Sequence, residues 1–118
     1  MITEDYVSFE IAKLLKEKGF DEYCGYYNND GEYWEYRVYN HRGEDYISAP
    51  TLQMTMKWLR EVHYLTIDVF HFRDWKVNIK TIPDDYFTAD YSYPELKPAE
   101  TYEQACEAAI KYCLENLI

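Results

Sequence analysis

The sequence predicts an α+β fold, in which an antiparallel sheet of about four to six strands is covered mainly on one face by three helices. Two observations lead to this prediction. Segments with the apolar spacing of helices stand near residues 9–18, 51–63 and 102–117. Between them lie short alternating segments that turn residues join into hairpins. Since 118 residues are the usual size of one domain, we expect a single domain over residues 1–118.

The first helix is marked at both of its ends. Ser8 is a suitable N-cap, and Gly19 is placed to end the helix because glycine readily adopts the left-handed conformation found there. Between them, Ile11, Leu14 and Leu15 follow the helical apolar spacing. We therefore expect Leu14 and Leu15 to be buried.

A hairpin follows this helix. The turn sequence Asn-Asn-Asp-Gly at residues 28–31 suits a tight turn, since Asp-Gly tolerates the positive φ that such a turn requires. It joins a strand at residues 23–27 to a second strand at residues 32–39. A further turn at residues 41–43 leads to a short third strand near residues 46–48.

The two faces of the second strand differ in polarity, because successive side chains of a strand point in opposite directions. One face carries Trp34, Tyr36 and Val38, and the other carries Tyr33, Glu35, Arg37 and Tyr39. Burying Glu35 and Arg37 would cost desolvation energy unless they were paired. We therefore expect Trp34 and Tyr36 in the core, and the face of Tyr33, Glu35, Arg37 and Tyr39 in solvent.

A second helix and a second hairpin come next. Pro50 and Thr51 stand near the start of the helix. Its apolar stripe contains Leu52, Met56, Leu59 and Val62. In the hairpin, apolar residues alternate with polar ones on both sides of a turn near residues 73–74: Leu65, Ile67 and Val69, then Trp75, Val77 and Ile79. We expect Leu59, Val62, Ile67 and Val69 to face inward.

Residues 83–100 contain three prolines and no clear period. A segment of this length inside a compact domain indicates a functional loop, disorder or a missed element. Residues 87–93 fit a short edge strand. Thr101 and Gln104 then form a capping box for the last helix, whose apolar side includes Ile110 and Leu114, both expected to be buried.

Charge limits the possible partners. Acidic residues outnumber basic ones 22 to 12, which gives a net charge of −10. Binding to a nucleic-acid backbone requires a basic patch, and an anionic membrane surface attracts basic segments. We therefore expect neither of these partners, whereas a basic protein would be attracted.

The cysteines and the chain start favour a reducing compartment. Cys106 and Cys113 lie seven residues apart in a predicted helix, which separates them by roughly 10 Å and is too far for a disulfide. Cys24 has no obvious partner. The first residues are polar and acidic, unlike a signal peptide, and no stretch has the length of a membrane-spanning helix. We expect a cytoplasmic protein with three reduced cysteines.

Three parts of the sequence carry a resemblance: Ile2–Glu10 with Lys18–Asp21, Ser48–Met54 with Met56–His63, and Thr101–Ala105 with Ala108–Tyr112. They are similar to a group of small proteins from gut bacteria and their phages and prophages. The resemblance covers the three predicted helices and supplies no activity and no catalytic residues. It implies an accessory protein of a mobile element, with a fixed helical scaffold and variable strands and loops.

No chemical motif stands out. His41, His63 and His71 titrate near neutral pH, but none has the HxH or HExxH spacing of metal ligands. The four glycines are isolated, so no phosphate-binding loop is present. We expect structural roles for the histidines, no catalytic residues, no metal on protein ligands and no cofactor.

Two compositional surpluses remain. Several of the 14 tyrosines crowd the first hairpin, where they serve either cross-strand packing or a contact surface, since tyrosine and arginine are frequent in interface hot spots. Acidic residues also crowd the last third of the chain: Asp84, Asp85, Asp90, Glu95, Glu100, Glu103 and Glu107. They indicate a solvated face or a mimic of nucleic-acid charge.

The function that the sequence favours is a non-enzymatic one. We expect an accessory protein of a phage or mobile element that binds another protein through Tyr33, Glu35, Arg37 and Tyr39. One alternative is a small enzyme or ligand-binding domain with a pocket built from His71, Trp75 and residues 83–100. The other is the acidic mimic.

Overall fold

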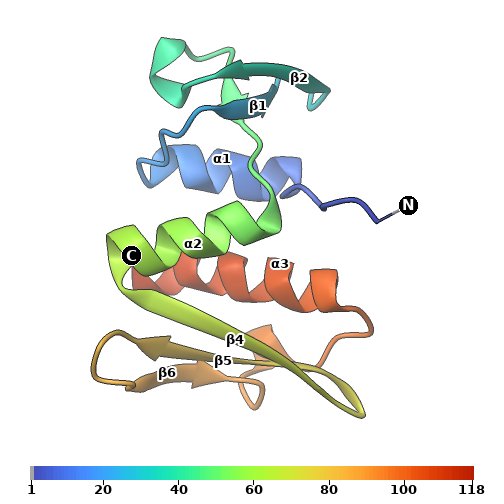
Figure 1. The fold of residues 1–118 in the computed structure, drawn as a ribbon, viewed down its shortest axis with the longest axis vertical. Helices are drawn as coiled ribbons and strands as arrows, with labels where there is room; N and C mark the ends of the chain where they lie inside the picture. Colours follow the sequence, from blue (N-terminus) through green and yellow to red (C-terminus); the bar gives the residue numbers. More distant parts are fainter. Residues whose placement is uncertain (1) are drawn as a thin grey trace. The chain divides into compact units, whose positions relative to one another are not determined.

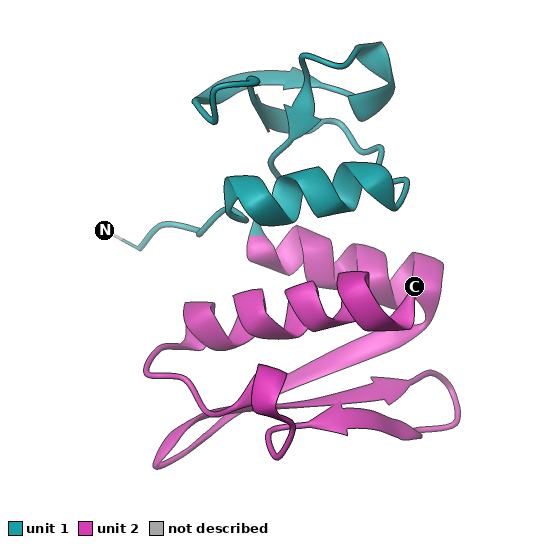
Figure 2. Cartoon of the chain, turned by 180° about the vertical axis from the view of Figure 1, so that it is seen from behind, with its two compact units in different colours: residues 1–51 teal, residues 52–118 magenta. Residues whose placement is uncertain are grey.

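A computed structural model describes residues 2–118 of the chain. These residues form two compact units, residues 2–51 and residues 52–118, drawn in teal and magenta in Figure 2. Each unit combines helix with antiparallel strands, so the predicted α+β class is confirmed. The single-domain assignment stays a prediction.

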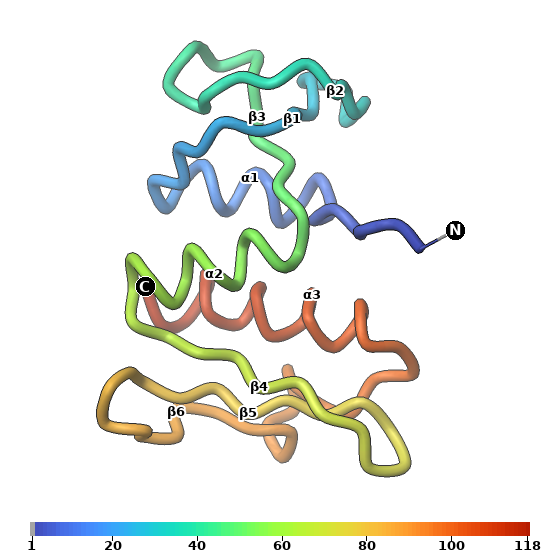
Figure 3. Tube along the Cα trace, viewed as in Figure 1, coloured from blue at the N-terminus to red at the C-terminus, as the bar shows by residue number. Residues whose placement is uncertain are grey.

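Unit 1 contains one helix and three strands: α1 (Phe9–Glu17), β1 (Cys24–Tyr27), β2 (Tyr33–Val38) and β3 (Ile47–Ser48). The strands form an antiparallel sheet in the order β2-β1-β3, and α1 packs against β3 (Figure 3). Both predicted ends of α1 are present. The Ser8 hydroxyl accepts a hydrogen bond from the Ile11 amide, and Gly19 has a φ of 90°.

The β1–β2 hairpin contains an irregularity that changes its register. Near the turn, Tyr27 pairs with Tyr33 and Tyr26 with Trp34, but at the far end Cys24 pairs with Val38. The bulge lies around Gly25, where a Cβ atom would come within 2.6 Å of the Tyr33 hydroxyl and 2.9 Å of the Trp34 carbonyl oxygen. Glycine is therefore required at this close approach of the two strands.

The prediction that Trp34 and Tyr36 are buried is wrong. Trp34 is 49% exposed and Tyr36 is 74% exposed, whereas Val38 on the same predicted face is buried. Two structural facts account for this. β2 is an edge strand, and the bulge interrupts the alternation on which the assignment of faces depended. Both faces of β2 are consequently accessible over most of its length.

Unit 2 contains two helices and three strands: α2 (Leu52–His63), β4 (Leu65–Phe72), β5 (Asp74–Thr81), β6 (Phe87–Asp90) and α3 (Tyr102–Tyr112). The antiparallel sheet has the order β4-β5-β6, and both helices cover the same face of it (Figures 1 and 3). The six strands thus divide into two three-stranded sheets, and the prediction of one larger sheet is only roughly matched.

The segment between β5 and α3 contains a strand and a short turn. The expected edge strand within residues 87–93 is present as β6, and a short 3-10 turn follows at Pro94–Leu96. The Thr101 hydroxyl then caps α3 by accepting from the Gln104 amide at 3.1 Å, as the capping box predicts. α3 continues as a π-helical turn over Cys113–Leu117.

The cores contain most of the residues expected there. Leu15, Leu59, Ile110 and Leu114 are fully buried. Leu14, Ile67 and Val69 are half-buried. Val62 is 50% exposed, so its predicted inward position is wrong. The buried side of α2 runs instead through Leu52, Thr55, Met56, Trp58 and Leu59, and Val62 lies beyond the edge of that stripe.

Within residues 2–118, every helix is too short or too polar to cross a membrane.

Candidate functional site

The loop between β2 and β3, residues 39–46, is held by polar contacts from three directions. The first comes from Asn40, which is buried. Its side-chain amide donates to the Phe20 carbonyl oxygen at 2.6 Å, and its Oδ1 atom accepts from the Ser48 amide at 2.8 Å. One side chain therefore ties the loop both to the end of α1 and to β3.

Lys16 and Asp21 provide the other two attachments. The Lys16 ammonium donates to the carbonyl oxygens of Gly43 at 2.7 Å and Tyr46 at 2.6 Å. Asp21 accepts from the His41 backbone amide at 3.0 Å and contacts the His41 ring nitrogen at 2.8 Å. Contacts separated this far in sequence fix the loop before any ligand arrives, which lowers the entropic cost of binding.

Aromatic rings pack along the same loop. Tyr23 and Tyr39 meet with ring centroids 5.2 Å apart, because the bulged register places them opposite each other beyond the Cys24–Val38 pair. Tyr39 also stacks on His41 at 5.3 Å, and Tyr46 contacts Tyr26 edge-on at 5.0 Å. The rings are thus fixed by their neighbours rather than left free in solvent.

Side chains of this region line an open surface cavity of about 290 Å³. Its lining consists of four tyrosines, two arginines and one valine: Tyr23, Tyr36, Arg37, Val38, Tyr39, Arg42 and Tyr46. We call this the tyrosine–arginine cavity. Its size lies just below the range for small-molecule sites, roughly 300–1,000 Å³.

The lining of the cavity contains two basic side chains and no acidic one. Among residues 2–118, neither Arg37 nor Arg42 takes part in an ion pair. Asp21 is already bound to His41. Desolvation raises the pKa of Asp21, but the hydrogen bonds from His41 outweigh it and leave that pKa below its ordinary value. Asp45 accepts a hydrogen bond from the Asn29 side chain at 2.7 Å. The carboxylates of Asp21 and Asp45 therefore have partners other than the two arginines.

The structure brings together only part of the predicted site. Arg37 and Tyr39 line the cavity, and Glu35 is exposed on the same strand. Tyr33 lies at the other end of β2, where its ring contacts Tyr6 at 4.7 Å and Tyr27 at 5.9 Å. Desolvation and a hydrogen bond with Tyr6 raise the pKa of Tyr33. Tyr33 thus makes a cross-strand packing contact, which is one of the two roles that the sequence left open.

Sequence reasoning missed Tyr23, Tyr36, Arg42 and Tyr46. A regular alternation along β2 predicts that Tyr36 faces the core, whereas the structure exposes it. An unbulged hairpin would place Tyr23 opposite Arg37, and the bulge moves it opposite Tyr39. Gly25 is the local signal from which the bulge could be predicted, since an isolated glycine within a strand pattern often marks a bulge.

The other two histidines show no catalytic arrangement. His63 is half-buried and its ring meets Trp58 edge-on at 4.7 Å, while its Nε2 atom has no hydrogen-bond partner within residues 2–118. His71 is exposed and contacts Trp75 edge-on at 4.9 Å. Trp75 in turn pairs through its backbone with Ala99. The His63 contact is therefore packing within α2, and the His71 contact is packing within the β4–β5 hairpin.

All three cysteines are free and buried. Burial raises the pKa of Cys24, raises that of Cys106 to about 11, and raises that of Cys113 to about 12. A nucleophilic cysteine has a lowered pKa and an accessible thiol. The cysteines therefore act as small apolar residues of the core.

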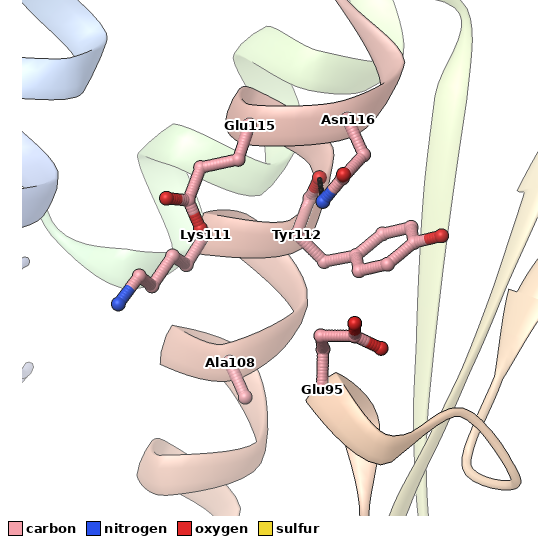
Figure 4. Close-up of a pocket in the computed structure, with 6 residues that line it drawn as sticks. All are labelled: Glu95, Ala108, Lys111, Tyr112, Glu115 and Asn116. Carbon is pink, nitrogen blue, oxygen red and sulfur yellow. Dashed lines mark hydrogen bonds between the residues drawn. The ribbon is translucent and has the colours of Figure 1, made fainter.

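A second cavity, of about 280 Å³, lies beside α3 in unit 2. Figure 4 shows Glu95 reaching from the 3-10 turn toward Tyr112, while Lys111 points away from the Tyr112 ring. The Asn116 side chain donates to the Tyr112 carbonyl oxygen at 3.2 Å. The polar groups of this cavity do not converge on one point, so it is the weaker candidate.

The acidic residues of the last third do not form a metal site. No group of three or more His, Cys, Asp or Glu side chains within the described residues is placed to hold a metal ion. Asp90 accepts from the Ser92 amide at 2.9 Å and from its hydroxyl, and these hydrogen bonds lower its pKa. Glu103 lies in the first turn of α3, where a negative charge is favourable.

Comparisons of the chain with protein-family models, with curated proteins and with solved structures found no match. The function is therefore argued from the geometry of the candidate site.

Proposed function

We propose that this chain is a non-enzymatic protein that binds a partner protein through the tyrosine–arginine cavity and its rim. One observation carries the proposal: the fixed loop at residues 39–46 and the adjoining β1–β2 hairpin together place four tyrosines and two arginines around one concavity. Tyrosine and arginine are the residues most often found in interface hot spots, together with tryptophan.

The biological setting belongs to the same proposal. A cytoplasmic location is supported by three free and buried thiols, which are the usual state of cysteine in a reducing compartment. The expectation that the partner comes from a host cell or a phage rests on the sequence resemblance alone. The sequence-based site is accordingly revised: Arg37 and Tyr39 are retained, Tyr23, Tyr36, Arg42 and Tyr46 are added, and Tyr33 is assigned to packing.

The test is a paired comparison of two tyrosines. Tyr39 and Tyr93 are both 40% exposed, but Tyr39 lines the cavity and Tyr93 lies in unit 2. A partner is captured from bacterial lysate and identified by mass spectrometry, and its affinity is measured for Tyr39→Ala, Tyr93→Ala and the unchanged chain. We expect Tyr39→Ala to weaken binding by more than about 1 kcal/mol, as hot-spot residues do.

Thermal melting of the same variants separates binding from folding. Tyr39 is partly exposed, so its replacement is expected to change the free energy of unfolding by less than about 1 kcal/mol. Tyr93→Ala should leave the affinity unchanged. Equal affinities for Tyr39→Ala and the unchanged chain would contradict the proposed function, whatever the melting temperatures show.

A further inference from the structure

The two arginines of the tyrosine–arginine cavity form no ion pair within the described residues. Arg37 comes from β2 and Arg42 from the loop that follows it, and both side chains line the same cavity. The Asp21 carboxylate pairs with His41, and the Asp45 carboxylate accepts a hydrogen bond from Asn29 and keeps its charge. An arginine pair of this kind matches the flat, two-oxygen geometry of carboxylate and phosphoryl groups.

The tyrosine rings that line the cavity suit the flat or apolar body of a ligand, whereas the arginines suit an oxyanion. Tyr23 and Tyr39 pack against each other, and Tyr46 is held edge-on by Tyr26, so three phenol rings have fixed positions. Aromatic faces favour flat or apolar groups, and their hydroxyls can still bond polar atoms. A volume of about 290 Å³ suits one side chain rather than a folded segment.

We infer that the cavity binds the oxyanion of one acidic or phosphorylated side chain of the partner protein, with Arg37 and Arg42 holding the oxyanion and the tyrosine rings holding the side-chain body. This inference rests on the proposed function and specifies the chemistry of the partner. A phosphoryl group carries nearly twice the charge of a carboxylate at neutral pH, so it binds more tightly to two guanidinium groups.

The net charge of −10 repels any anionic ligand electrostatically. This repulsion has a short range, because at physiological ionic strength charges more than about 8 Å apart are largely screened. The two guanidinium groups act at contact distance, where a hydrogen bond to a charged group is strongest. Binding should therefore depend on both arginines and weaken as salt is added.

The test uses small capped amino acids as probes and two-dimensional NMR of the full chain as the readout. The probes are N-acetyl-phosphotyrosine amide, N-acetyl-glutamate amide, N-acetyl-tyrosine amide and inorganic phosphate, each at millimolar concentration. We expect phosphotyrosine amide to shift the amide signals of residues 37–42 and 46, with glutamate amide giving smaller shifts at the same positions. Tyrosine amide should give none, because it lacks the oxyanion.

Arginine variants define the site. Arg37→Gln and Arg42→Gln should each weaken phosphotyrosine amide binding at least about tenfold, as expected for loss of a charge-assisted hydrogen bond. Arg60→Gln, an exposed position on α2, is the matched control and should bind normally. The inference would be overturned if neither phosphotyrosine amide nor glutamate amide shifted any signal. It would also be overturned if the Arg37→Gln and Arg42→Gln variants bound phosphotyrosine amide as tightly as the unchanged chain does. Equal binding of inorganic phosphate and phosphotyrosine amide would also overturn it, since the rings would then contribute nothing.

The two proposals fail in different ways. If Tyr39→Ala loses the captured partner but neither arginine variant does, the proposed function stands and the oxyanion inference is wrong. If the arginine variants lose the phosphotyrosine probe while Tyr39→Ala keeps the partner, the cavity binds oxyanions and the proposed function is wrong.

Discussion

Replacing Leu59 with alanine is expected to lower the free energy of unfolding by about 2–5 kcal/mol. Leu59 is fully buried on α2, the helix that packs against β4 in unit 2. The truncation removes buried apolar surface and leaves a cavity that the neighbouring residues fill only in part. Urea unfolding followed by circular dichroism measures the loss. A change below about 1 kcal/mol would mean that Leu59 is not a core residue.

Val62 is the matched control on the same helix. The sequence predicted an inward position for it, but it is half exposed. Val62→Ala should therefore change stability by no more than about 0.5 kcal/mol, and the higher helix propensity of alanine offsets part of any loss. A loss comparable to that of Leu59→Ala would restore the original prediction that Val62 faces the core.

Replacing Asn40 with alanine is expected to cost about 2–4 kcal/mol, although the residue lies in a loop. The variant removes the partners of two backbone groups, the Phe20 carbonyl oxygen and the Ser48 amide. Both of those residues are buried, so water does not easily replace the lost hydrogen bonds. Each buried group left unsatisfied costs about 1–3 kcal/mol.

Asn29→Ala is the control for this loop. Asn29 is exposed, and its side chain bonds the exposed carboxylate of Asp45. We expect its replacement to change the free energy of unfolding by less than about 0.5 kcal/mol. The Asn40→Ala variant should also bind phosphotyrosine amide less tightly, because the loop that carries Arg42 loses an anchor. Unchanged stability of Asn40→Ala would show that the loop is not held in the way described.

The sequence predicted the helices well because their ends carry local signals. Ser8 and Gly19 for α1, and Thr101 for α3, act on backbone groups within a few residues of themselves. Such signals are independent of the rest of the fold. For the same reason the turn at residues 28–31 was found, since Asn28 Oδ1 accepts from the amides of Asp30 and Glu32.

The candidate site was predicted only in part because it depends on non-local geometry. The bulge at Gly25 shifts the register between β1 and β2, and no property of β2 alone indicates that shift. The edge position of β2 in a separate three-stranded sheet decides that Trp34 and Tyr36 are exposed. Arg37 and Tyr39 were identified by their polarity, whereas Arg42 reaches the cavity through a loop anchored at Asn40.

Because each unit contains at least one buried cysteine, the reactivity of these thiols can report whether the two units unfold together. Cys24 lies in unit 1, and Cys106 and Cys113 lie in unit 2. A buried thiol with a raised pKa reacts with an alkylating reagent only when its surroundings open. Timed alkylation, with each cysteine resolved by mass spectrometry, therefore reports the opening of each unit under native conditions. Equal rates at all three sites would mean that the 118 residues unfold as one cooperative domain, and a faster Cys24 would mean that unit 1 opens on its own.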